Sequence, residues 1–177
     1  MSFRWFAGTF VPGGDRCKQA LLAGAVLAVA GCGGGDVGTR PVNGTGYAFT
    51  APAGWTLLRM QRTVQLSHGI ELVSVTRFPL LRAYRTELWQ QVVTEIDRSA
   101  AALAAGQKGT VTSRATTTLA GRRARRYDIA YESDGKRLIE RVAFVLRAKT
   151  EYELLCRFER GKSSSACDTL FRSFRLN

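Results

Sequence analysis

Apolar and polar residues alternate over short stretches between residues 47 and 79, as they do in β-strands that bury one face. The pattern predicts strands over residues 47–50, 55–59, 64–67 and 70–78. Pro52-Ala53-Gly54 and His68-Gly69 supply turns between them. Pro79 has no amide hydrogen to donate to a neighbouring strand, so the last of these strands is expected to end there.

From residue 84 to residue 104 the apolar positions recur every three or four residues, which predicts one amphipathic helix. Gly106 and Gly109 are expected to end it. The polar side of this helix is mixed in charge, whereas a helix that lies on a membrane surface is rich in Lys and Arg there. The apolar stripe is therefore expected to face the protein core. It consists of Leu88, Trp89, Val92, Val93, Ile96, Ala100 and Leu103.

Four long strands and a second helix are predicted for the rest of the chain. The strands cover residues 111–119, 124–132, 138–147 and 152–158, and Asp134-Gly135 is typical of a two-residue hairpin turn. The Thr-rich first strand is expected at a sheet edge or half-exposed. Ser163 or Ser164 is expected to cap the helix that follows. These elements predict an α+β fold, in which an antiparallel β-sheet is flanked by helices.

Cys156 and Cys167 are predicted to form a disulfide. Cys156 lies on the apolar face of its strand and Cys167 on the apolar side of the last helix, and both sides are expected to face the core. Metal binding is the alternative use of two thiols. Two thiolates with the single histidine of the chain make a poor metal site, so no metal or cofactor is expected.

The first 31 residues have the parts of an export signal in the right order. A basic region with Arg4, Arg16 and Lys18 precedes an uncharged run over 20–30, and Ala30-Gly31 stand directly before Cys32. This arrangement resembles the lipobox of bacterial lipoproteins, in which the cysteine thiol receives a diacylglyceryl group. The apolar run is about half the roughly 20 residues that a membrane-spanning helix needs, which argues against a plain transmembrane anchor.

The predicted organisation therefore has three parts. Residues 1–31 are a lipoprotein signal peptide, residues 32–46 a lipidated cysteine with a Gly-rich flexible tether, and residues 47–177 the folded domain. A diacylglyceryl group supplies at least two acyl chains, which is enough for stable anchoring. The expected location is the extracytoplasmic face of a cell membrane, reached through the lipid on Cys32.

The chain is strongly basic. The leader holds three of the 26 Lys and Arg residues and one of the 14 Asp and Glu residues, which leaves a net charge of about +10 on the rest. Such a surface is attracted to anionic lipid headgroups or acidic envelope polymers. An exported and tethered protein rarely meets nucleic acid, so no specific nucleic-acid partner is expected.

The order of elements after residue 46 resembles the PsbP-like superfamily. The resemblance rests on Phe49-x-x-Pro52-x-Gly54-Trp55, the middle amphipathic helix, Gly121-x-x-Ala124 at the start of a strand, and Phe171-x-Ser173-Phe174 after a short helix. The superfamily includes the extrinsic photosystem II subunit, a Ran-binding nuclear import factor and many bacterial lipoproteins. The resemblance implies an α/β/α sandwich. It does not imply an enzyme, because the characterised members mostly act by binding other proteins. The lipobox and the pair Cys156 and Cys167 depart from the photosynthetic members, so a photosynthetic role is not expected.

Candidate chemistry is sparse. His68 lies in a predicted turn, without a serine and an acid arranged around it. Several carboxylates lie on the predicted strands, among them Glu140, Glu151 and Glu153, and the Arg and Lys residues between them favour cross-strand ion pairs on a solvated face.

Four arginines fall within five residues at the start of the 124–132 strand. They are Arg122, Arg123, Arg125 and Arg126, and they are the candidate anion-binding site. A solvated strand end is the alternative. In an extended strand Arg123 and Arg125 share a face with Tyr127, and the other two point the opposite way.

These observations predict a non-enzymatic lipoprotein whose domain binds another envelope component, either a protein or an anionic lipid or polymer. Two alternatives remain open. A carrier of an apolar ligand would have a continuous cavity beside Trp55 and Trp89. A hydrolase acting on the envelope would have a pocket with convergent polar groups and a titrating pair.

Overall fold

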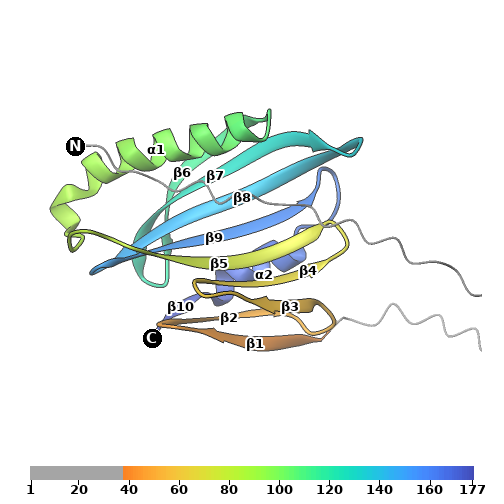
Figure 1. Ribbon diagram of the computed structural model, residues 1–177, viewed down its shortest axis with the longest axis horizontal. Coiled ribbons are helices and arrows are strands. Elements are labelled where there is room, and N and C mark those ends of the chain that lie inside the picture. Colours follow the sequence, from red (N-terminus) through yellow and green to blue (C-terminus); the bar gives the residue numbers. More distant parts are fainter. Residues whose placement is uncertain (1–37) are drawn as a thin grey trace, which may run out of the picture. The chain divides into compact units, whose positions relative to one another are not determined.

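Ten β-strands and two α-helices make up residues 38–177, the part of the chain that the computed structural model describes (Figure 1). Seven strands form one sheet in the order β3-β4-β5-β9-β8-β7-β6, and every neighbouring pair is antiparallel. The strands are β3 Thr56–Arg59, β4 Thr63–His68, β5 Glu71–Pro79, β6 Thr110–Leu119, β7 Arg122–Ser133, β8 Lys136–Arg147 and β9 Thr150–Glu159. Strands that pair in this sheet are consecutive in the sequence, with one exception. The strands β5 and β9 pair although β6, β7 and β8 lie between them in the sequence.

A second, three-stranded sheet has the order β1-β2-β10. It contains β1 Thr39–Gly44, β2 Tyr47–Pro52 and β10 Arg175–Leu176. Residues 39–44 were expected to belong to a flexible tether, and this expectation is wrong. They pair with β2 along its whole length, and the Val42 side chain is only 2% exposed because it is part of the core. Pro41 and Gly44 within this segment, together with the glycines that precede it in the sequence, concealed the strand.

The two α-helices lie on opposite faces of the seven-stranded sheet (Figure 1). The helix α1 Trp89–Gly106 covers β6, β7 and β8, whereas α2 Ser165–Ser173 lies on the other face together with the three-stranded sheet. The predicted α+β fold with a helix on each side is therefore confirmed.

Each face of the large sheet has its own hydrophobic core. The residues on β7 and β8 alternate between the two cores, as the two-residue period of a strand requires. The core under α1 contains Ile96, Ala100, Ala104, Tyr127, Ile129, Val142, Phe144 and Leu146. The core on the α2 side is larger and includes Phe49, Leu66, Val73, Val75, Val145, Leu154 and Leu170.

The first helix begins later than the apolar pattern predicts. Residues 86–88 form one turn of 3₁₀-helix, and Leu88, expected in the buried stripe, is 37% exposed. The amide of Tyr84 donates to the carbonyl of Ala148, and the amide of Leu80 donates to that of Lys149. These two bonds fix the 80–84 segment to the turn between β8 and β9, so the α-helix starts at Trp89.

The predicted hairpin and helix cap are both present, with one difference. Asp134 and Gly135 join β7 to β8, and both have positive φ angles, as this hairpin turn requires. Ser164 occupies the N-cap position of α2, but its hydroxyl bonds the Asp168 carboxylate rather than a backbone amide. The Ser163 hydroxyl instead accepts a hydrogen bond from the Ser165 amide.

The predicted disulfide is confirmed. Cys156 of β9 and Cys167 of α2 are bonded, with their Cα atoms 5.5 Å apart, and both side chains are buried in the α2-side core. Residues 36–177 form one compact unit that contains both cores and this disulfide, so we expect them to fold on their own.

The predicted signal peptide, residues 1–31, and the lipidation site Cys32 lie outside the described residues. Within residues 38–177, neither helix has the length and apolar content needed to cross a bilayer.

Candidate functional site

The four arginines of the predicted anion-binding site are divided between the two faces of the large sheet. All lie at the start of β7, where successive side chains alternate in direction. Arg123 and Arg125 lie on the α1 side, the side of Tyr127, and Arg122 and Arg126 belong to the opposite face. The structure therefore does not bring all four guanidinium groups together.

Arg125 is already paired within the protein. Its guanidinium contacts the carboxylate of Asp97 on α1, and the Tyr127 hydroxyl donates to the same carboxylate. Burial tends to raise the pKa of Asp97, but the hydrogen bonds from Arg125 and Tyr127 outweigh this effect and lower it. Arg125 thus joins β7 to α1 and has little capacity left for an external anion.

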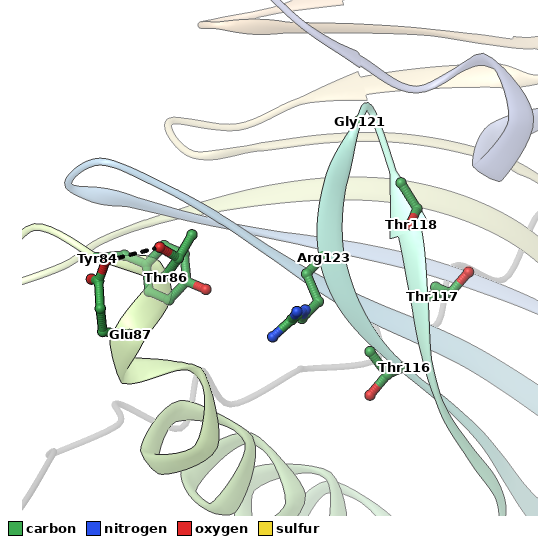
Figure 2. Close-up of a pocket in the computed structure, with 8 residues that line it drawn as sticks. All are labelled: Tyr84, Thr86, Glu87, Thr116, Thr117, Thr118, Gly121 and Arg123. Carbon is green, nitrogen blue, oxygen red and sulfur yellow. Dashed lines mark hydrogen bonds between the residues drawn. The ribbon is translucent and has the colours of Figure 1, made fainter.

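Arg123 is the member of the run that faces a surface hollow (Figure 2). The hollow has a volume of about 650 Å³ and lies between the 84–87 segment and β6. Three successive threonines of β6, Thr116, Thr117 and Thr118, line it together with Tyr84 and Glu87. The Arg123 guanidinium also lies over the Trp89 ring, 5.4 Å from its centroid, which fixes its direction.

The carboxylates on β8 and β9 are not the solvated ion pairs that the sequence suggested. Glu140 and Glu151 are buried, and Glu153 is partly buried. All three lie on the α1-side face, because they have the parity of Val142 and Phe144 in the strand register. Asp128 of β7 does form a cross-strand ion pair of the expected kind, with Arg141 of β8 at 2.8 Å.

Burial raises the pKa of each of these three glutamates. It raises the pKa of Glu151 to about 7, and the nearby Glu153 carboxylate adds to the effect. Burial also raises the pKa of Glu153 to about 7, with a further contribution from Glu140. The Glu140 carboxylate accepts a hydrogen bond of 2.6 Å from the Gln107 amide at the end of α1, which opposes but does not cancel the effect of burial on its pKa. None of these three glutamates lines the hollow at Arg123.

His68 is exposed at the end of β4, beside the turn to β5. Its ring stacks on the Trp55 ring with the centroids 6.5 Å apart. This is the location expected for a turn residue, and no hydrogen bond joins its ring to a serine or an acid within the described residues.

A second hollow, of about 220 Å³, was not predicted from the sequence. It lies where the turn after β1 meets the turn between β3 and β4, and three arginines line it: Arg59, Arg62 and Arg77. No Asp or Glu lines it. These arginines are up to 18 positions apart in the chain, so no local pattern could reveal them as a group. One local signal for this surface was present in the sequence. Two apolar residues and a cation directly follow each other near a strand end, in the run Leu57-Leu58-Arg59-Met60.

The fold of this chain is comparable to solved structures. No family model matches the chain, and no curated protein matches it. The solution structure of cyanobacterial PsbP (CyanoP) from Synechocystis sp. PCC 6803 superposes with a TM-score of 0.58 at 15% identity. It covers 84% of this chain and 98% of that one. The chain has a PsbP-like fold.

Other solved structures superpose on this chain with lower TM-scores. A crystal structure from Bacteroides thetaiotaomicron gives a TM-score of 0.56 at 9% identity, and this chain spans about half (48%) of that protein's length. LpqN of Mycobacterium tuberculosis, described as involved in cell envelope biogenesis, gives a TM-score of only 0.40 at 11% identity. That similarity is too small to support an argument. At these identities the PsbP-like likeness concerns the fold alone.

Proposed function

We propose that this chain is a membrane-anchored accessory module of the cell envelope that binds another envelope component and does not catalyse a reaction. The anchor is the lipid on Cys32, and the PsbP-like domain is the binding part. The observation that carries this proposal is the location of the unpaired cations. Arg123 in one hollow, and Arg62 and Arg77 in the other, face surface depressions without an ion pair to a described acid.

Binding is favoured over catalysis by the separation of the perturbed groups from the hollows. A hydrolase needs titrating groups that converge on a pocket. The glutamates with raised pKa, Glu140, Glu151 and Glu153, lie elsewhere on the sheet and line neither hollow. Buried carboxylates with a raised pKa also occur as structural groups, so they do not by themselves support an enzyme.

The carrier alternative requires an apolar cavity beside Trp55 and Trp89. The Trp89 side chain is 5% exposed and lies beneath the Arg123 guanidinium. The hollow at Arg123 is lined largely by Thr side chains and the hollow at Arg77 by Arg and other polar side chains. These features favour a surface that binds polar or anionic groups over one that holds an apolar ligand.

The anchor is tested first, by mass spectrometry of the natural protein and by incorporation of labelled fatty acid. The expected product begins at Cys32 with a diacylglyceryl group. The Cys32→Ser variant should lose the label, whereas the Cys17→Ser variant should keep it, since Cys17 lies within the leader. A wild-type product that keeps residues upstream of Cys32 and takes up no lipid would refute the anchor.

The binding role is tested by purification of the lipidated protein from detergent-solubilised membranes after cross-linking. We expect a recurrent envelope protein in stoichiometric amount, or a co-purifying anionic lipid or polymer. Recovery of co-purifying apolar ligand in place of both would support the carrier instead.

A further inference from the structure

Strand β3 and the turn that follows it combine exposed apolar side chains with arginines that form no ion pair within the described residues. Leu57, Leu58 and Met60 are 36%, 48% and 50% exposed, and they are three of the five large apolar side chains exposed on the described part. Arg59 lies between them and Arg62 follows them, both exposed. A cluster of exposed apolar residues flanked by cations is typical of a surface that rests in the headgroup region of a bilayer.

The adjacent hollow is shaped for an anion. The Arg59 Nη1 atom donates to the Asn43 carbonyl at 2.8 Å, which holds this guanidinium at the rim. Arg77 reaches the hollow from β5, and its Nε atom is buried without any hydrogen-bond partner. An unsatisfied buried donor is costly unless an acceptor reaches it. Arginine forks bind phosphate oxygens bidentately, so a phosphate group fits this set of donors.

The backbone around the hollow is well fixed. The Met60 amide donates to the Thr63 carbonyl at 2.8 Å, and the Arg77 amide donates to the Arg62 carbonyl at 2.9 Å. The Thr63 and Thr76 hydroxyls share a hydrogen bond of 3.0 Å across β4 and β5. The backbone positions that carry the three arginines are therefore set before any ligand binds, which lowers part of the entropy cost of binding.

The chain length allows this edge to reach the membrane that carries the anchor. The hollow lies at the Gly44 end of β1, five residues from Thr39, or about 17 Å along a strand. Thr39 is seven positions after Cys32, and a chain of seven steps spans at most about 25 Å. The reach of this segment therefore exceeds the distance from Thr39 to the hollow.

We propose that the β3–β4 edge docks the domain on the bilayer, with an anionic phospholipid phosphate held by Arg59, Arg62 and Arg77 and with Leu58 and Met60 inserted beside it. This inference rests on the proposed membrane-anchored function and names the surface that lies against the membrane. The hollow carries three positive charges and no lining acid, so it favours an anionic headgroup over a zwitterionic one.

The test uses residues 36–177, the compact unit without the lipid, so that binding reports the surface and not the anchor. Its affinity is measured by sedimentation with vesicles of equal parts phosphatidylglycerol and phosphatidylcholine, at low and high salt. We expect salt-sensitive binding that Arg59→Gln with Arg62→Gln weakens at least about tenfold, because each arginine near an anionic surface contributes on the order of tenfold or less. Arg82→Gln with Arg85→Gln removes the same charge from exposed positions outside the hollow, and should weaken binding less than about threefold.

The apolar part of the surface is tested by spin labels on Met60→Cys and on Leu81→Cys, since Leu81 is 87% exposed and lies outside this edge. On vesicles the label at residue 60 should become accessible to oxygen and shielded from a water-soluble nickel reagent, and the label at residue 81 should remain in water. Circular dichroism of every variant checks that the fold is kept.

Three results would overturn the docking surface. One is an equal loss of binding in both arginine double variants, and another is a water-exposed label at residue 60 on vesicles. The third is displacement from vesicles by millimolar inorganic phosphate but not by chloride of equal ionic strength, which would assign the hollow to a soluble phosphate. If vesicle binding is absent while the lipidated protein still captures an envelope protein, this inference fails and the proposed function stands.

Discussion

The Arg125 guanidinium of β7 donates two hydrogen bonds to the Asp97 carboxylate of α1, at 3.0 Å from Nε and 3.4 Å from Nη2. The Tyr127 hydroxyl donates to the same carboxylate. Asp97 and Arg125 are 28 positions apart in the sequence and belong to different elements, so this contact fixes how α1 lies across the sheet. It also removes one arginine from the cationic run that the sequence presents as a single patch.

Replacement of Asp97 by Asn should destabilise the domain by about 1–3 kcal/mol, because Arg125 would keep its partly buried location without its charge partner. The lowered pKa of Asp97 contributes stability that is present above the unfolded-state pKa of about 4 and is lost as pH falls through the folded-state value. Urea unfolding at pH 7 and at pH 3 should show a smaller penalty at the lower pH.

Glu95→Gln is the matched control for that measurement. It breaks the pair between Glu95 and Arg98 on the same helix, whose side chains are 47% and 69% exposed. We expect a change below about 0.5 kcal/mol, since exposed pairs contribute little. Equal losses in the two variants would contradict the role assigned to Asp97.

Removal of the disulfide by Cys156→Ala with Cys167→Ala should lower the free energy of unfolding by about 2–4 kcal/mol. The bond closes a short loop, restricts the unfolded chain and joins α2 to the sheet. Thermal unfolding with and without a reductant is the measurement. The reductant should lower the Tm of the wild type and leave that of the double variant unchanged. A wild-type Tm that does not respond, with the thiols shown to be reduced, would count against a stabilising bond.

The buried Glu151 predicts that the domain becomes less stable as pH rises. Its folded-state pKa is raised to about 7, so between about pH 4.5 and pH 7 the folded chain holds a proton that the unfolded chain has released. The contribution of Glu151 to stability is therefore fully present below that window and is lost as pH rises through it. Glu151→Gln should flatten this dependence and make the domain about 1–3 kcal/mol more stable than the wild type at pH 8.

Chemical unfolding at pH 5 and at pH 8 measures the effect, with Glu132→Gln as control, since Glu132 is exposed on β7. The control should keep the pH dependence of the wild type. We base this prediction on Glu151 and not on Glu153, because Glu151 is only 4% exposed and its Oε1 atom has no hydrogen-bond partner. The same slope in the wild type and in Glu151→Gln would show that this carboxyl is ionised in the folded state.

Gly44 should not tolerate a side chain. A Cβ atom at this position would lie 2.1 Å from the Tyr47 Cζ atom, and Tyr47 is 1% exposed. The ring is also held by a hydrogen bond of 3.1 Å from its hydroxyl to the Val75 carbonyl, so it cannot move aside freely. Gly44→Ala should therefore cost about 1–3 kcal/mol. Gly38→Ala, where a Cβ meets nothing within 4 Å, should leave the Tm unchanged.

Much of the fold could be predicted from the sequence, because buried positions recur every second residue in a strand and every three or four residues in a helix. Tyr152, Leu154, Cys156 and Phe158 alternate along one strand, and each one is part of or packs against the α2-side core. Ile96 and Ala100 recur at helical spacing, and both lie on the face of α1 that is buried against the sheet. Residues 39–44 escaped detection because Pro41 and Gly44 resemble linker residues, and the strand is stabilised by its pairing with β2 and by burial of Val42, which depend on distant residues.

The candidate site was less readable. The arginine run at 122–126 is visible in the sequence, but alternation along β7 divides it and Asp97 neutralises one member. The hollow with Arg59, Arg62 and Arg77 depends on contact between two sheets, which no local pattern encodes. The acids of β8 and β9 were misread for a similar reason. Arg141 and Lys149 lie near them in the sequence, whereas in the sheet Glu151 and Glu153 lie opposite the apolar Leu146 and Phe144.

The sequence alone determined the order and type of most elements, the disulfide partners and the predicted lipid anchor, because these depend on residue type and on spacing along the chain. The tertiary structure decided which charges are paired, which carboxylates have their pKa raised by burial and which cations face the surface together. These properties depend on burial and on distances between residues far apart in sequence, and both are set only when the two sheets and two helices pack.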